Sequence, residues 1–238
     1  MNTMKSIALA ILAIAILVAA PPTILAQTTA PSAPVPADEK QKASAEKHLK
    51  PILDALKLQD PAKETAVRAA VSEFFAAHNT WHQSNDAKLK ELWNNFNHAR
   101  SKQDKAAADK ALADIDAVYA TFKPDHEKFL NSLAAVLSPD QIATVEDALT
   151  VNKVKVTYNV YLQIFPTLTD EQKKVVLKDL EDAREQAIDA GSMAEKSAFF
   201  KKYKIKIEED YLTAQGYDPK QARKDFAAKG KSADAEAK

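Results

Sequence analysis

The chain has 238 residues, 46% of them hydrophobic, which is enough for one or two domains with a hydrophobic core. Its 33 basic and 33 acidic side chains give no net charge, so the composition does not favour nucleic acid as a partner. The absence of cysteine excludes disulfides and thiolate chemistry, and three glycines are too few for a glycine-rich phosphate loop or a turn-rich all-β fold. The composition therefore predicts a helical protein.

Residues 1–26 have the pattern of an export signal. Lys5 precedes an unbroken apolar run of 14 residues over 7–20, which is shorter than the roughly 20 residues of a membrane-spanning helix. Two prolines end the run, and small residues before Gln27 suit cleavage after Ala26. An uncleaved N-terminal anchor is the alternative. We expect cleavage, a periplasmic or secreted location, and no membrane association once the signal is removed.

Residues 27–37 are predicted to be a disordered linker, because this segment has three prolines among eleven residues and almost no bulky apolar side chains. The remainder, 38–238, has apolar residues at helical spacing almost throughout. We therefore predict a single all-helical domain over 38–238, and a subdivision near residue 135 is left open.

Short motifs mark several helix ends. The Ser/Thr-x-x-Gln/Glu pattern of a capping box begins at Ser138, Thr169 and Ser192. Gly191 and Gly216 stand where the preceding helices should end, so both are predicted to be left-handed C-caps. Because the link at Gly191 is short, the helices on either side of it should pack antiparallel.

The segment 151–166 is ambiguous, because its density of β-branched and aromatic residues also suits a short extended crossing segment. The predicted fold class is all-α, a multi-helix bundle with antiparallel helical hairpins, with the extended alternative left open for this segment only.

Two histidines lie at a spacing that binds metals in some helices. His78 and His82 are four residues apart, so their imidazoles share one helix face. The sequence offers no third ligand at a fixed spacing, and a half-buried helix face explains the pair equally well. We predict no metal site and no cofactor.

An acidic ladder is formed by Glu181, Glu185 and Asp189, which are spaced by four residues and would repel one another on a helix. Lysines of the following helix are the first explanation for how this charge is neutralised. The alternative is that Glu185 and Asp189, together with Arg184, bind a cation or a hydroxyl-rich ligand.

Most of the tyrosines lie in the last third of the chain. An aromatic ring with a polar tip suits a sugar, which packs its C–H groups on the ring and bonds through its hydroxyls. Packing between helices is the alternative. The predicted ligand-binding residues are Tyr158, Tyr161, Arg184, Glu185, Asp189, Tyr203 and Tyr211.

Catalysis is not expected. Paired carboxylates suit a glycosidase, but helical glycosidases are longer toroids than this chain can form. The sequence also lacks the Gly-x-Ser-x-Gly elbow of many hydrolases. We predict no catalytic residues.

The C-terminal half carries a recognisable pattern. Residues 149–218 include the blocks VTYNVYLQIFPTLTDEQ and LEDAREQAIDAGSMAEKSAFFKKYKIKIEEDYLTAQGYD, preceded by LSPDQIATVEDALT. This pattern resembles a family of exported bacterial domains of unknown function that is described as sugar-binding and associated with polysaccharide utilisation. The resemblance is strong over residues 135–218 and weaker over 45–134. It implies an all-α exported domain in a carbohydrate context and supplies no catalytic residues.

A second, local resemblance leaves an alternative open. Leu137–Gln141 and Leu168–Gln172 resemble the Leu-Thr-x-x-Gln motif of small periplasmic stress chaperones, although any capping box after a leucine has this pattern. We predict an exported, non-catalytic carbohydrate-binding domain or polysaccharide-utilisation accessory protein. The alternatives are a chaperone-like helical protein of the periplasm and a carbohydrate-active enzyme. Carbohydrate is the expected partner, nucleic acid is not, and the oligomeric state is left open.

Overall fold

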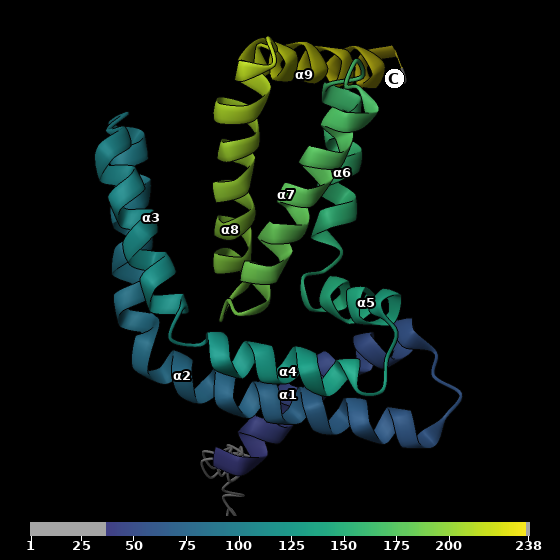
Figure 1. Ribbon diagram of the computed structural model, residues 1–238. Coiled ribbons are helices and arrows are strands. Elements are labelled where there is room, and N and C mark those ends of the chain that lie inside the picture. The colour runs from purple at the N-terminus through teal and green to yellow at the C-terminus, as the bar shows by residue number, and fades with distance from the viewer. Residues whose placement is uncertain (1–36, 237–238) are drawn as a thin grey trace, which may run out of the picture. The chain divides into compact units, whose positions relative to one another are not determined.

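Helices make up the regular structure of the computed structural model, which describes the backbone of residues 37–236 and the side chains of 45–229 (Figure 1). The described elements are, in chain order, α1 (Ala37–Leu56), α2 (Pro61–Ser101), α3 (Lys105–Tyr119), α4 (Lys123–Ala134), α5 (Pro139–Leu149), α6 (Lys153–Ile164), α7 (Asp170–Ile188), α8 (Met193–Ile205), the π-helix η1 (Lys206–Leu212) and α9 (Pro219–Glu236). No strand occurs over 37–236, so the all-α prediction is confirmed. The predicted signal and linker lie outside the described residues, except for Ala37, which begins α1.

Capping boxes begin two helices where the sequence predicts them. The hydroxyl of Ser138 accepts from the N–H of Gln141, and the Gln141 side chain accepts in return from the N–H of Ser138, at the start of α5. Thr169 and Gln172 make the same reciprocal pair at the start of α7. Both segments that resemble the chaperone motif are therefore accounted for by helix initiation.

The ambiguous segment 151–166 is mostly helical, because α6 occupies twelve of its residues. Val154, Tyr161 and Phe165 are buried, at spacings of seven and four residues that place them on one helix face. The extended alternative is wrong, because burial of this face outweighs the β-propensity of the individual residues.

Two groups of buried side chains form the core. The first lies among the C-terminal half of α2, α3, and the helices from α6 to η1, and it includes Trp93 and Phe199. The second lies among α1, the N-terminal half of α2, α4 and α5, and it includes Phe74 and Phe129. Because α2 is 41 residues long and contributes to both groups, it connects the two parts of the core.

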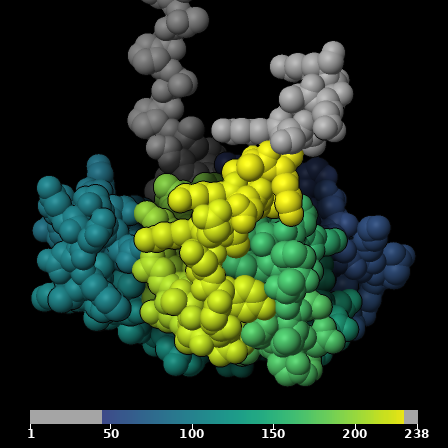
Figure 2. Space-filling view, turned by 90° about the horizontal axis from the view of Figure 1, so that it is seen from above, coloured from purple at the N-terminus to yellow at the C-terminus, as the bar shows by residue number. Residues whose placement is uncertain are grey.

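The C-terminal helices pack on one another in the order of the chain. α7 and α8 lie side by side and antiparallel, joined by a short turn (Figure 1). α9 packs on α6 and η1, and Figure 2 shows the yellow surface of α9 beside the green surface that includes α6. Glu208 of η1 fastens this arrangement, because it accepts from the Tyr161 hydroxyl at 2.5 Å and from Nε of Arg223 at 2.7 Å. Among the described helices, none combines the length and apolar character needed to cross a membrane.

Candidate ligand-binding cleft

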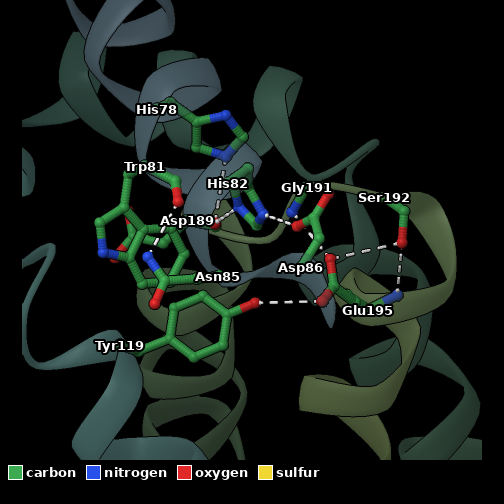
Figure 3. A network of polar contacts seen from close by, with 10 residues as sticks. All are labelled: His78, Trp81, His82, Asn85, Asp86, Tyr119, Asp189, Gly191, Ser192 and Glu195. Carbon is green, nitrogen blue, oxygen red and sulfur yellow. Dashed lines mark hydrogen bonds and ion pairs between the residues drawn. The ribbon is translucent and has the colours of Figure 1, made fainter. Parts of the chain in front are cut away.

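A network of polar contacts surrounds the C-terminus of α7 (Figure 3). The carbonyl oxygen of Asp189 accepts from Nε2 of His82 at 2.8 Å and from Nε2 of His78 at 3.1 Å. The ammonium of Lys196 donates to the carbonyl oxygen of Ala187 at 2.9 Å. The last carbonyls of a helix lack intrahelical donors and favour positive charge. Side chains from α2 and α8 therefore cap α7, and they fix the α7–α8 turn against α2.

The two histidines are used by this network. Burial, helped by the neighbouring His82, lowers the pKa of His78 to about 3, so His78 is neutral and donates through Nε2. Both imidazoles direct Nε2 at the backbone of Asp189. Over the described residues, no group of three or more His, Asp or Glu side chains is arranged to hold a metal ion.

His126 of α4 neutralises part of the acidic ladder. Its Nδ1 is 2.7 Å from Oδ1 of Asp189, and its Nε2 is 3.5 Å from Oε2 of Glu185. Burial alone would lower the pKa of His126, but the hydrogen bonds and charges of these two carboxylates together raise it to about 10. The predicted neutralisation by lysines of the next helix holds only in part: Lys196 acts on Asp189 through its charge, whereas Lys202 bonds Asp116 of α3.

Arg184 fastens α7 to α5. Its guanidinium is 2.6 Å from a carboxylate oxygen of Glu146 and 2.8 Å from one of Asp147. Burial and the charge of Glu185 raise the pKa of the buried Glu146 to about 7. Arg184, Glu185 and Asp189, three of the residues predicted to bind a ligand, thus lie together at the C-terminal end of α7, and each forms an ion pair with another protein side chain.

Gly191 permits the close approach of the α7–α8 turn to α2. A Cβ added to Gly191 would lie 2.6 Å from Nδ1 and 2.7 Å from Cε1 of His82. The prediction that Gly191 is a left-handed C-cap is wrong, because its backbone does not have a positive φ. Among the described glycines, Gly216 is the one with a positive φ, of +85°. The ring of His82, and not the backbone conformation, excludes a side chain at residue 191.

A cleft of about 400 Å³ opens beside this network, between α2 and the N-terminal end of α8. Its volume is within the range of about 300–1,000 Å³ that is common for small-molecule sites. The small side chains of Ala194 and Ala198 leave this space open on the α8 side. This α2–α8 cleft is lined by Asp86, Lys90, Trp93, Asn94, Asn97, Gly191, Ser192, Ala194, Glu195 and Ala198.

α2 presents a stripe of exposed polar side chains to the cleft, formed by Asp86, Lys90, Asn94 and Asn97 at spacings of four, four and three residues. Within the described residues, no hydrogen bond or ion pair engages Lys90 or Asn94, whereas Asn97 accepts from Lys201 at 3.1 Å through Oδ1. The stripe therefore offers a ligand one carboxyl group, one ammonium group and two amides.

Two carboxyl groups lie at the end of the cleft nearest the network. Oδ1 of Asp86 is 2.5 Å from Nδ1 of His82. Glu195 accepts from the N–H of Gly191 at 3.0 Å and, through its other oxygen, from the hydroxyl of Tyr119 at 3.5 Å. Burial raises the pKa of Tyr119, so this hydroxyl keeps its proton. Figure 3 shows Asp86 and Glu195 beside Gly191.

The four tyrosines predicted to bind a ligand lie outside this cleft. Tyr161 is 1% exposed and bonds Glu208. Tyr203 lines a separate cleft of about 260 Å³ between α3 and α8. Tyr158 and Tyr211 are half-buried against the first part of the core. Packing between helices thus accounts for most of their ring surface, and the structure does not gather them with Arg184 into one cleft.

The residues predicted to bind a ligand include none of Asp86, Asn94, Asn97 and Glu195, which line the cleft. Asp86, Asn94 and Asn97 share one face of α2, and this helical spacing was the available signal, but such spacing also describes any solvent-exposed helix face. Glu195 lies on α8, where the sequence showed it only as part of the capping pattern that begins at Ser192. Only the contact of the α7–α8 turn with α2 shows which face of α2 borders a cleft.

These features describe an all-helical protein in which a polar network fixes a helical hairpin beside a ligand-sized cleft. The chain belongs to DUF3826, a family of proteins of unknown function, whose family model matches residues 42–232. The match spans most of the described helices, and the expected membership of a family of unknown function is confirmed. No curated protein matches the chain.

Proposed function

We propose that the protein binds carbohydrate in the α2–α8 cleft, as an exported domain that serves polysaccharide utilisation. The observation that carries the proposal is the stripe of four polar side chains on α2 that borders a cleft of about 400 Å³ opposite Glu195. Two of the four, Lys90 and Asn94, make no hydrogen bond or ion pair with the described residues, and Asp86 and Asn97 each bond one protein group. The resemblance of residues 135–218 to domains of carbohydrate context supports the same function.

The chemistry of the stripe suits hydroxyl groups. A sugar hydroxyl both donates and accepts, so it needs both kinds of partner close together. The second oxygen of Asp86 is an acceptor, the ammonium of Lys90 is a donor, and the amide of Asn94 supplies both. The chain has no net charge that would select a polyanion instead.

The walls of the cleft suit the C–H faces of a sugar ring. Trp93, which is 6% exposed, lines the cleft together with Ala194 and Ala198. The indole N–H of Trp93 is buried and has no hydrogen-bond partner among the described residues. Buried donors are usually paired, so a ligand hydroxyl that reached this N–H would gain a hydrogen bond.

Binding is tested with a glycan array of neutral and acidic oligosaccharides from plant and bacterial polysaccharides, followed by calorimetry on the strongest binder. Asn94→Ala should weaken binding by about fivefold to tenfold, because one lost hydrogen-bonding partner costs about 1 kcal/mol. Asn95→Ala is the matched control, since Asn95 is also exposed on α2 but does not line the cleft. Absence of binding on the array, or equal effects of the two variants, would contradict the proposal.

Export is tested separately. Residues 1–26 have the charged start, short apolar run and small-residue end of a cleaved signal. The mature protein should be recovered from the periplasm or the medium, and its N-terminal sequence should begin at Gln27. A protein that keeps residue 1 and stays in the cytoplasm would contradict this part of the proposal.

A further inference from the structure

The contact between His82 and Asp86 holds a proton at the edge of the cleft. The carbonyl oxygen of Asp189 can only accept, so Nε2 of His82, which is 2.8 Å away, carries a hydrogen. Nδ1 of the same ring is 2.5 Å from Oδ1 of Asp86, a distance at which one of the two atoms must donate. Either a protonated Asp86 donates to a neutral imidazole, or an imidazolium donates to a carboxylate. In both arrangements the pair has one proton to give.

Glu195 is held in place as a hydrogen-bond acceptor. It receives hydrogen bonds from the N–H of Gly191 at 3.0 Å and from the hydroxyls of Ser192 and Tyr119 at 3.5 Å. It also lies in the first turn of α8, where the helix dipole favours negative charge. A carboxylate has about four acceptor positions, so one position of Glu195 stays free for a ligand or a water molecule.

Gly191 brings the donor pair and the acceptor together. The His82 ring that bonds Asp86 is also the ring that an added Cβ on Gly191 would meet at 2.6 Å. The amide of Gly191 bonds Glu195 on its other side. The Asp86–His82 pair and Glu195 therefore flank the same residue (Figure 3), and Asp86, Gly191 and Glu195 all line the cleft.

We infer that the α2–α8 cleft hydrolyses a glycosidic bond of the carbohydrate it binds, with the Asp86–His82 pair as the proton donor and Glu195 as the proton acceptor. This inference rests on the proposed carbohydrate binding. The proton that Asp86 and His82 share passes through the Asp86 carboxyl group to the bridging oxygen as the bond between the bridging oxygen and the anomeric carbon breaks, which leaves His82 neutral and Asp86 ionised. Glu195 takes a proton from the water that attacks this carbon. One water is consumed, two sugars are released, and the proton on Glu195 returns to the pair through solvent. His82 shares the proton with Asp86 and, through its bond to the Asp189 carbonyl, positions the Asp86 carboxyl group.

Two kinds of substrate distinguish the proton-donor role of Asp86 from the proton-acceptor role of Glu195. The probes are 4-nitrophenyl α- and β-glycosides of the common neutral hexoses, pentoses and deoxyhexoses, and the matching unactivated disaccharides. Nitrophenolate leaves without a proton, so Asp86→Asn should slow hydrolysis of the disaccharide on the order of 10²–10⁴-fold but leave the nitrophenyl rate within about tenfold. Glu195→Gln should slow both on the order of 10²-fold or more. Glu91→Gln, an exposed α2 side chain away from the cleft, is the control and should change neither.

Every other result contradicts the catalytic inference, in whole or in part. If wild-type protein binds an array glycan but hydrolyses no probe, the catalytic inference is overturned and carbohydrate binding stands. If Asp86→Asn slows both substrates equally, Asp86 is not the proton donor. If no glycan binds and no probe is cleaved, the inference and the proposed function both fail. Circular dichroism and thermal melting of each variant establish that a lost rate does not reflect a lost fold.

Discussion

Replacement of Gly191 by alanine should destabilise the protein through a steric clash with the His82 ring. The added Cβ would lie 2.6 Å from Nδ1, 2.7 Å from Cε1 and 3.1 Å from Cγ of His82. Real Cβ contacts are almost never shorter than 3.0 Å, so the ring or the turn has to move. The His82 ring has little freedom to move, because it is buried and bonded to Asp189 on one side and to Asp86 on the other.

The magnitude follows from these contacts. Overpacking in a rigid site costs about 1–3 kcal/mol, and displacement of the His82 ring would also remove a hydrogen bond worth about 0.5–1.5 kcal/mol. The entropy that alanine removes from the unfolded chain returns about 0.4–1 kcal/mol. We therefore expect Gly191→Ala to lower the free energy of unfolding by about 2–3 kcal/mol.

Urea denaturation of a double-mutant cycle with His82→Ala measures this effect. If the collision is the cause, Gly191→Ala should cost less than about 0.5 kcal/mol in the His82→Ala background, which gives a coupling energy of about 2 kcal/mol. Gly216→Ala is a contrasting control: nothing lies within 4 Å of its added Cβ, so its cost comes from the positive φ and should not depend on His82.

The reasoning is refuted if Gly191→Ala is neutral in the wild-type background. It is equally refuted if the substitution costs the same with and without the His82 ring, because the destabilisation would then arise in the turn itself.

Three further predictions concern the contacts of the C-terminal helices. The pKa of His126 is raised from 6.5 to about 10, so its stabilising contribution is complete below about pH 6.5 and is lost as the pH rises through about 10. The difference in melting temperature between wild type and His126→Gln should therefore shrink over this range of pH. A difference that stays constant would contradict this prediction. Lys196→Met should lower the free energy of unfolding by about 1.5–3 kcal/mol in urea, because it removes the charged donor at the end of α7; unchanged stability would show that water replaces it. Arg223→Met should increase amide exchange in α9 but not in α7, since Arg223 joins α9 to Glu208; equal exchange in both helices would contradict this local role.

The sequence by itself determined the helical architecture and several helix starts. The capping boxes at Ser138 and Thr169 depend on side chains three residues from their partners, so local pattern is enough to find them. The buried face of α7, which includes Ala183 and Ala187, follows from helical spacing in the same way. Only α6 was ambiguous, because the β-propensity of its residues opposes their helical burial pattern.

The tertiary structure alone decided the candidate site. His82 and Gly191 are more than one hundred residues apart, and no local pattern shows that a ring of α2 occupies the space where a Cβ would stand. Because the α7–α8 turn lies against α2, the polar face of α2 that includes Asp86 and Asn94 forms one wall of a cleft. The neutralisation of Asp189 by His126 likewise depends on α4 packing against α7. Helix formation is governed by neighbours within one or two turns, whereas the cleft, its charges and the role of Gly191 are set by which helices meet, and that is decided by packing of the whole core.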